Sequence, residues 1–258
     1  MNPVQARRWL ELVWWKAMAE LKAEAARAYI GILWWVAEPA LYMAAFYVAF
    51  GAGIRAGGVH AVPFLLTGLV PWKWFASSVQ GGSGAIQANS GLIQQVYVPK
   101  AILPFIVMVI NGIKFLVVLA LLLLVLAAMG YPPEPVWVAL PVVMLVEFLL
   151  IVALGSLAAS ILPLLPDFKL IVDNGLIMLM FLSGIFYDVD KLPPAAAAVL
   201  RLNPMVWIIK AFRSVLMEHA WPRWDTLLAV AVFSLVVYAL ALAVLRAYDR
   251  HYTKLMVG

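Results

Sequence analysis

The sequence predicts an all-α protein that crosses a lipid bilayer several times, and three observations support this. Of the 258 residues, 66% are hydrophobic and only 12% are charged, and the mean hydropathy is +0.99. A soluble domain of this size needs a polar surface, so much of this chain must face lipid. The apolar residues also form blocks of the roughly 20 residues that a spanning helix needs. We therefore expect six transmembrane helices, with five or seven as the alternatives.

The first predicted element is an amphipathic helix over residues 4–28, within an N-terminal segment 1–28. Leu10, Val13, Trp14 and Leu21 recur at helical spacing, whereas the charged residues point elsewhere. Such a helix lies along a membrane surface with its tryptophans at the depth of the headgroups. A docking surface for another subunit is the alternative. The segment lacks the short apolar core of a secretory signal, so we expect it to remain in the mature protein.

The predicted spans follow the apolar blocks and belong to a single membrane domain over residues 1–258. They cover residues 30–52, 62–82, 101–129, 136–163, 169–187 and 226–247. Spans one to five thus lie within 30–187, and the last span with its tail lies within 224–258. Lys and Arg residues are more frequent on the side that holds both ends of the chain, which places both termini in the cytoplasm.

An uncharged polar stretch, residues 77–100, joins the second and third predicted spans. We expect a short amphipathic helix over 84–97, between Gly84 and Pro99, that offers both faces to a protein partner. A solvated loop is the alternative. Its apolar and polar candidates for partner contact are Ile86, Gln87, Asn89, Leu92 and Ile93.

The region 188–223 is apolar but interrupted. Pro193-Pro194 can start a helix, Asn203-Pro204 breaks it, and a second helix is predicted to follow. Each piece is too short to span a bilayer alone. We expect two half-helices, 192–202 and 205–218, that enter and leave the outer leaflet.

Motifs of nucleotide or covalent chemistry are missing from the sequence. Gly81-Gly82-Ser83-Gly84 lacks the Gly-Lys-Ser/Thr that completes a phosphate-binding loop, and Ala85 stands where a hydrolase elbow requires glycine. There is no cysteine, and the three histidines lie far apart. We therefore predict no catalytic constellation and no metal site. The net charge of +5 fits anchoring at anionic lipids rather than nucleic-acid binding.

Two further residue groups are candidates for function. Ionisable residues fall within predicted spans, and no role is predicted for Lys73, Lys114 or the mid-span Glu147. Aromatic residues share one face of the first predicted span and close the fifth: Trp35, Tyr42, Phe46, Phe50, Phe186 and Tyr187. Flat rings of this kind can line a path for a carbohydrate. Packing between helices and membrane belts are the favoured alternatives.

Five motifs, taken in order, resemble the membrane subunit of bacterial ABC-2-type polysaccharide exporters of the capsule, O-antigen and teichoic-acid kind. They are residues 31–39 (GILWWVAEP), 68–75 (GLVPWKWF), 89–93 (NSGLI), 98–104 (VPKAILP) and 202–205 (LNPM). The resemblance covers nearly the whole chain. It implies an interface helix, six spans, a coupling helix at 84–97 and two re-entrant gate helices.

The resemblance also implies partners and a cargo. Two copies of the chain would form a homodimeric pathway in the bacterial inner membrane, above two copies of a separate ATPase subunit. ATP and magnesium would then belong to that subunit, and this chain would be neither an enzyme nor a cofactor-binding protein. The cargo would be a lipid-linked polysaccharide, with Arg27 and Lys100 as candidates for attracting the lipid phosphate. Ordinary anchoring explains these two cations equally well.

Three other functions stay open at this point. An ABC-2 exporter of a small amphiphile, such as a drug or lipid, would share the spans and the ATPase. A membrane enzyme acting on lipid-linked sugars would need clustered carboxylates or a metal site. A secondary carrier would show an inverted repeat of broken helices.

Overall fold

A computed structural model of the chain describes residues 3–27, 60–95, 98–249 and 252, together with the isolated residues 37, 41, 44 and 48. All regular structure in these residues is helical, which confirms the predicted all-α class. The first predicted span, 30–52, lies outside the described residues apart from those isolated positions. So do four of its candidate residues: Trp35, Tyr42, Phe46 and Phe50.

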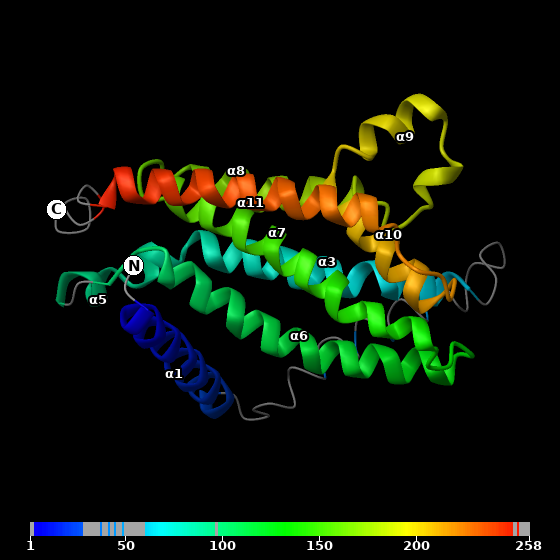
Figure 1. Ribbon diagram of the computed structural model, residues 1–258, viewed down its shortest axis with the longest axis horizontal. Helices are drawn as coiled ribbons and strands as arrows, with labels where there is room; N and C mark the ends of the chain where they lie inside the picture. The colour runs from blue at the N-terminus through cyan, green and yellow to red at the C-terminus, as the bar shows by residue number, and fades with distance from the viewer. Residues whose placement is uncertain are drawn as a thin grey trace.

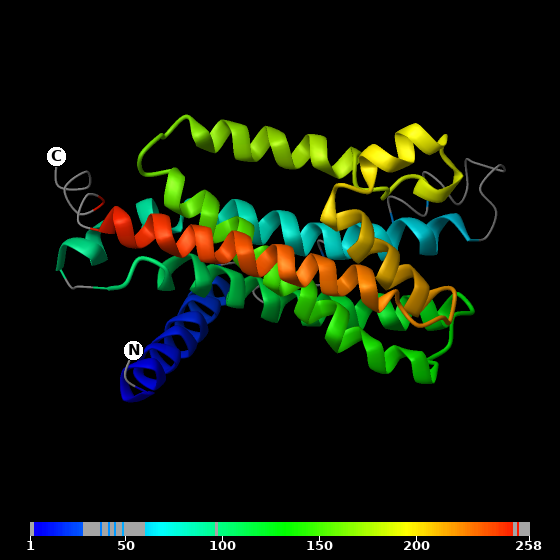
Figure 2. The same cartoon turned by 45° about the horizontal axis from the view of Figure 1, so that its top comes forward.

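Long helices lying alongside one another form the body of the molecule (Figure 1, Figure 2). They are α3 (Ala61–Ser83), α6 (Ile102–Ala128), α7 (Leu140–Ile161), α8 (Phe168–Phe181) and α11 (Trp224–Ala247). Helix α7 is central: it packs most extensively against α11 and also against α3. Helix α1 (Pro3–Arg27) lies at the edge of this body, oblique to the long helices, and packs on α6.

Short helices connect the long ones at both ends. Helices α4 (Ala85–Ala88) and α5 (Ser90–Gln95) follow α3, and the 3₁₀ helix η2 (Pro135–Ala139) precedes α7. At the end of the molecule away from α5, η3 (Val189–Lys191), α9 (Pro194–Leu200) and α10 (Pro204–Leu216) lie between α8 and α11. We call the segment η3–α9–α10 the elbow, because α9 and α10 meet at a bend of 99°.

Among the described helices, three are long and apolar enough to cross a membrane: Ile102–Ala128, Pro135–Ile161 and Trp224–Ala247. The bent pair α9–α10 makes a fourth if it is counted as one span. The three match the third, fourth and sixth predicted spans. Helices α3 and α8 coincide with the second and fifth, but α8 has 14 residues and is therefore only about 21 Å long. That falls short of the ~30 Å hydrocarbon core, so a count of six spans does not follow from these helices alone.

Local sequence signals explain where several helices begin and end. Proline occupies the first turn of α7, α9 and α10, where its missing N–H costs no hydrogen bond. Asn203 caps α10 by accepting a hydrogen bond from the Met205 amide at 3.0 Å. Gly130 ends α6 with a φ of +94°, and the Tyr131 amide bonds back to the Leu126 carbonyl at 3.0 Å.

The predicted helix over 84–97 is two short helices rather than one. Asn89 separates α4 from α5, and its side-chain amide donates to the Ala85 carbonyl at 2.8 Å. An asparagine that bonds to the backbone four residues earlier competes with the helical pattern. The break therefore lies at the residue whose side chain offers the backbone an alternative partner.

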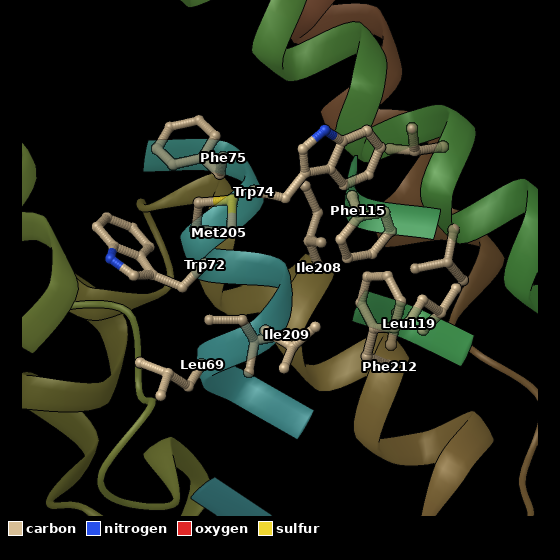
Figure 3. Close-up of a cluster of buried hydrophobic side chains, with 14 of the residues drawn as sticks. Leu69, Trp72, Trp74, Phe75, Phe115, Leu119, Met205, Ile208, Ile209 and Phe212 are labelled. Atoms are coloured by element: carbon tan, nitrogen blue, oxygen red, sulfur yellow. The ribbon is translucent and has the colours of Figure 1, made fainter. Parts of the chain in front are cut away.

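The buried core lies where α3, α6, α7 and α10 meet. Trp74 stacks on Phe115 with ring centroids 4.1 Å apart and an interplanar angle of 11°. Figure 3 shows Ile208 and Phe212 of α10 beside these rings and Ile209 of α10 beside Leu69 of α3, so α10 of the elbow is packed into the core. The pair of helices predicted after the fifth span is thus present, with its break at Asn203-Pro204.

Candidate functional site

The end of the molecule that holds α4 and α5 is built around one apolar cluster, which we call the base cluster. Its buried members come from the segment 85–103, the last turn of α7 and the C-terminal part of the chain: Ala85, Ile86, Ile93, Val98, Leu103, Ala159, Leu245 and Tyr252. Segments distant in the sequence therefore meet beneath α4 and α5. This end is one candidate site, and the elbow is the other.

The segment 85–95 turns its apolar side chains inward. Ile86 is fully buried and Ile93 nearly so, whereas Leu92 and Asn89 are half-buried. The exposed positions carry small or polar residues: Gln87, Ala88, Gly91, Gln94 and Gln95. An amphipathic segment of this kind offers a partner its polar face, because the protein's own base cluster covers the other.

Helix α1 is attached both to α6 and to this segment. Val13, Ala17 and Leu21 are buried against α6. Lys16 donates to the Asn89 side-chain oxygen at 2.6 Å, at the break between α4 and α5. Farther along, Lys114 of α6 lies 2.6 Å from a carboxylate oxygen of Glu24. The amphipathic helix predicted over residues 4–28 is thus a continuous helix that contacts the predicted coupling segment directly.

The two predicted phosphate-binding cations lie in different settings. The Lys100 side chain is only 4% exposed, and its ammonium group lies 3.1 Å from Asp249. Arg27 is the last residue of α1, and its side chain is outside the described part of the structure. The structure therefore shows Lys100 held inside the base by an acid of the C-terminal segment.

The two described aromatic candidates lie where α8 leads into the elbow. Phe186 is half-buried and stacks with Phe181 at a centroid distance of 5.6 Å. The Tyr187 hydroxyl donates to the Phe181 carbonyl at 2.7 Å. Both rings therefore have local packing partners.

Arg213 joins α10 of the elbow to α3 and to the segment that follows α8. Its guanidinium donates to the carbonyls of Gly184 at 2.8 Å, Ile185 at 2.9 Å and Phe64 at 3.1 Å. It also lies 3.4 Å from the centroid of the Phe64 ring, a cation–π contact. The sequence does not predict that Arg213 joins these segments, because it binds backbone carbonyls, which every residue has and which no pattern of side chains reveals.

Asp190, in η3, links the end of α9 to α10 through two ion pairs. It pairs with Arg201 at 2.9 Å and with Lys210, one cation beyond α9 and the other on α10. Hydrogen bonds from Lys210 and Arg201 hold the pKa of Asp190 below its ordinary value. The cavity beside these residues measures about 70 Å³, well below the ~300–1,000 Å³ of small-molecule sites.

One buried acid lies in the bundle interior. Glu147 of α7 is fully buried, and no hydrogen-bond partner for its carboxyl oxygens is found in the described part of the chain. Within the same residues, no three His, Asp or Glu side chains are grouped as metal ligands.

The sequence comparisons define the class of protein. Residues 11–217 match the profile of the ABC-2 type transporter family, so the chain belongs to this family, as a membrane subunit. Membership makes it a permease component that works with an ATPase subunit, rather than an enzyme.

The similar proteins are of two kinds, permeases of O-antigen export and a transport protein for polysialic acid. The chain is 33% identical over 221 residues to the O-antigen export system permease protein RfbA of Myxococcus xanthus, covering 84% of each chain. It is 25% identical over 200 residues to a protein of the same name from Klebsiella pneumoniae, covering 77% of each. The polysialic acid transport protein KpsM of Escherichia coli is 25% identical over 237 residues, covering 90% of this chain and 91% of that one.

Proposed function

We propose that this chain is the channel-forming membrane subunit of an ATP-driven exporter that moves lipid-linked polysaccharide out of the cytoplasm. The observation that carries the proposal is the extended similarity to permeases of O-antigen and polysialic acid, over 77–90% of the chain. The glycan is of the O-antigen, capsule or teichoic-acid type. A long polymer cannot be enclosed in one closed cavity, so it needs a continuous path.

The proposed assembly has two copies of this chain and two ATPase subunits in the bacterial inner membrane. Each copy contributes six spans, of which the described long helices supply five: α3, α6, α7, α8 and α11. The segment 30–52 is the remaining span. Both termini are cytoplasmic, which places α4 and α5 on the side of the ATPase and the elbow on the outer side. Helix α1 then lies at the inner surface, where its exposed Trp14 and Trp15 reach headgroups.

The exposed face of the segment 85–95 is the proposed contact with the ATPase. It carries Gln87, Ala88 and Gln94, whose size and polarity suit a reversible contact with a soluble protein. Ile86 and Ile93 support this face from below, since they are buried in the base cluster. Leu92 and Asn89 lie between the two layers.

The six aromatic candidates are proposed to line the polymer path. Stacking on rings is relatively indifferent to sugar identity and lets a chain slide, whereas a deep hydrogen-bonded pocket would hold it. Of the two cations proposed for the lipid phosphate, Arg27 is favoured. Lys100 is buried and already paired with Asp249.

Reconstitution of the chain with its ATPase in vesicles tests the function. We expect lipid-linked glycan to stimulate ATP hydrolysis and to enter the vesicle lumen, with the glycan-free lipid carrier as the control. Equal stimulation by the free carrier or by small amphiphiles, without glycan movement, would contradict a polysaccharide cargo. It would support the small-amphiphile exporter instead.

A crosslinking experiment tests the contact with the ATPase. A photoreactive residue at Gln94, at the exposed edge of α5, is expected to capture the ATPase subunit. The matched control is the same residue at Val138 of η2, which is exposed near the opposite end of the molecule. Capture at Val138 but not at Gln94 would reverse the proposed orientation.

A further inference from the structure

Two residues that follow α11, Asp249 and Tyr252, lie in the base of the molecule. Tyr252 is fully buried there and belongs to the same cluster as Ile86, Ile93 and Val98. Leu245, near the end of α11, lies in that cluster too. The segment that supports the proposed ATPase contact thus rests on side chains from the end of the last span.

Two polar links fix this segment. The Tyr252 hydroxyl donates to the Ser160 carbonyl at 2.6 Å, and Asp249 pairs with Lys100 at 3.1 Å. Lys100 lies between the proposed coupling segment and α6, and Ser160 belongs to the last turn of α7. The carbonyls of a last helical turn have no partner within their own helix, so the Tyr252 hydroxyl satisfies a group that α7 leaves open.

The coupling segment reaches the same end of α7 by itself. Gln87 of α4 donates to the Leu162 carbonyl at 3.4 Å, two residues beyond Ser160. The end of α7 therefore receives one hydrogen bond from the coupling segment and one from the C-terminal segment. Burial raises the pKa of Tyr252 to about 12, so its hydroxyl keeps its proton and stays a donor at physiological pH.

We propose that Tyr252 and the Lys100–Asp249 pair are positioning residues that convey displacement of the coupling segment to α7 and α11. This inference rests on the proposed function, because it requires an ATPase that pushes on residues 85–95. When that segment moves, the base cluster moves with it, since Ile86 and Tyr252 are fully buried members of this one cluster. The two polar links then pull on the ends of α7 and α11 in a fixed direction, which apolar packing alone does not provide.

The experiment compares ATP consumption with export in the complete complex of this chain and its ATPase. Tyr252→Phe keeps the ring in the base cluster and removes only the hydroxyl. We expect the amount of glycan exported per ATP hydrolysed to fall about fivefold, the equilibrium effect of one net hydrogen bond. Assembly with the ATPase and the rate of ATP hydrolysis should stay at the native level.

Two further variants make the result specific. Tyr248→Phe is the matched control, because it removes the same group four residues earlier from a side chain that is 45% exposed, and it should leave the ratio native. Asp249→Lys should lower the ratio, because it places two cations together in the base. Combining it with Lys100→Asp restores opposite charges and should recover most of the loss.

The results separate this inference from the proposed function. A native ratio of export to hydrolysis in both Tyr252→Phe and Asp249→Lys would overturn the inference while the function stands. An equal loss of assembly, hydrolysis and export would also overturn it, since that is the result of a purely structural role. Absence of glycan export by the unmodified complex would instead contradict the proposed function.

Discussion

Replacement of Arg213 by methionine is expected to destabilise the elbow far more than any change on its surface. Methionine keeps much of the length of the side chain but leaves the carbonyls of Gly184, Ile185 and Phe64 without this donor. Lys210→Met is the matched control. It makes the same replacement three positions earlier on α10, where the ammonium pairs with Asp190 at an exposed site.

The magnitude follows from the hydrogen bonds. Each carbonyl that loses its buried donor costs about 1–3 kcal/mol. Relief of the desolvation of a buried guanidinium offsets part of this sum. We therefore expect a net loss near 3 kcal/mol for Arg213→Met. An exposed ion pair is worth at most about 1 kcal/mol, so Lys210→Met should cost less than that.

The difference in stability between the two variants is measured as a Tm. Each detergent-solubilised fluorescent fusion is heated, and the remaining folded protein is quantified by size-exclusion chromatography. One kcal/mol shifts the Tm of a chain of this size by about 2–4 °C, so Arg213→Met should lower it by roughly 6–12 °C. Lys210→Met should lower it by less than about 4 °C. Similar shifts for the two variants would refute the reasoning, because the buried carbonyl contacts would then contribute nothing beyond a surface charge.

Three further predictions follow from individual contacts. Gly68→Ala should lower the Tm, because the added Cβ would lie 2.9 Å from a guanidinium nitrogen of Arg213. The decrease should be smaller than that of Arg213→Met. An unchanged Tm would show that the guanidinium has room to move. The Tm difference between the native protein and Asp190→Asn should be constant from pH 7 to 5 and should shrink only below pH 3.8, the ordinary pKa of an aspartate. The reason is that the pKa of Asp190 is lowered in the folded protein, so its stabilising charge is lost only as the pH falls below the unfolded-state pKa. A Tm difference that already shrinks near pH 5 would contradict this. Asn89→Ala removes the acceptor of Lys16 and should raise amide hydrogen exchange in α1; unchanged exchange would mean that packing on α6 alone holds the helix.

Much of the secondary structure could be predicted from the sequence, because its signals are local. Apolar blocks long enough to span a bilayer marked α6, α7 and α11. The Asn203-Pro204 pair marked the break between α9 and α10, since asparagine caps a helix and proline cannot continue one. The break at Asn89 was not predicted, because it depends on one side chain choosing a backbone carbonyl over solvent.

The site could be predicted only in part, for a physical reason. The alternation of Ile86, Gln87 and Ile93 identifies an amphipathic segment but not which face another part of the same chain covers. Arg213 contacts carbonyls 28, 29 and 149 residues away, and backbone carbonyls are present at every position. Such contacts are fixed by the tertiary arrangement and have no counterpart in residue spacing.

The base and the elbow are connected through α7, and burial explains why this helix is suited to link them. Each of the three spanning candidates contains an apolar stretch of 18 residues, and 56% of that stretch is buried inside the protein in η2–α7, against 28% in α6 and 22% in α11. A lipid-facing helix can shift by displacing lipid, whereas a helix enclosed by protein can shift only together with its neighbours. The elbow's α10 packs on both α7 and α3, and the base holds α7 through Ser160 and Leu162. Packed side chains along α7 thus connect the base with the elbow, and the buried Glu147 lies on α7 between these two regions.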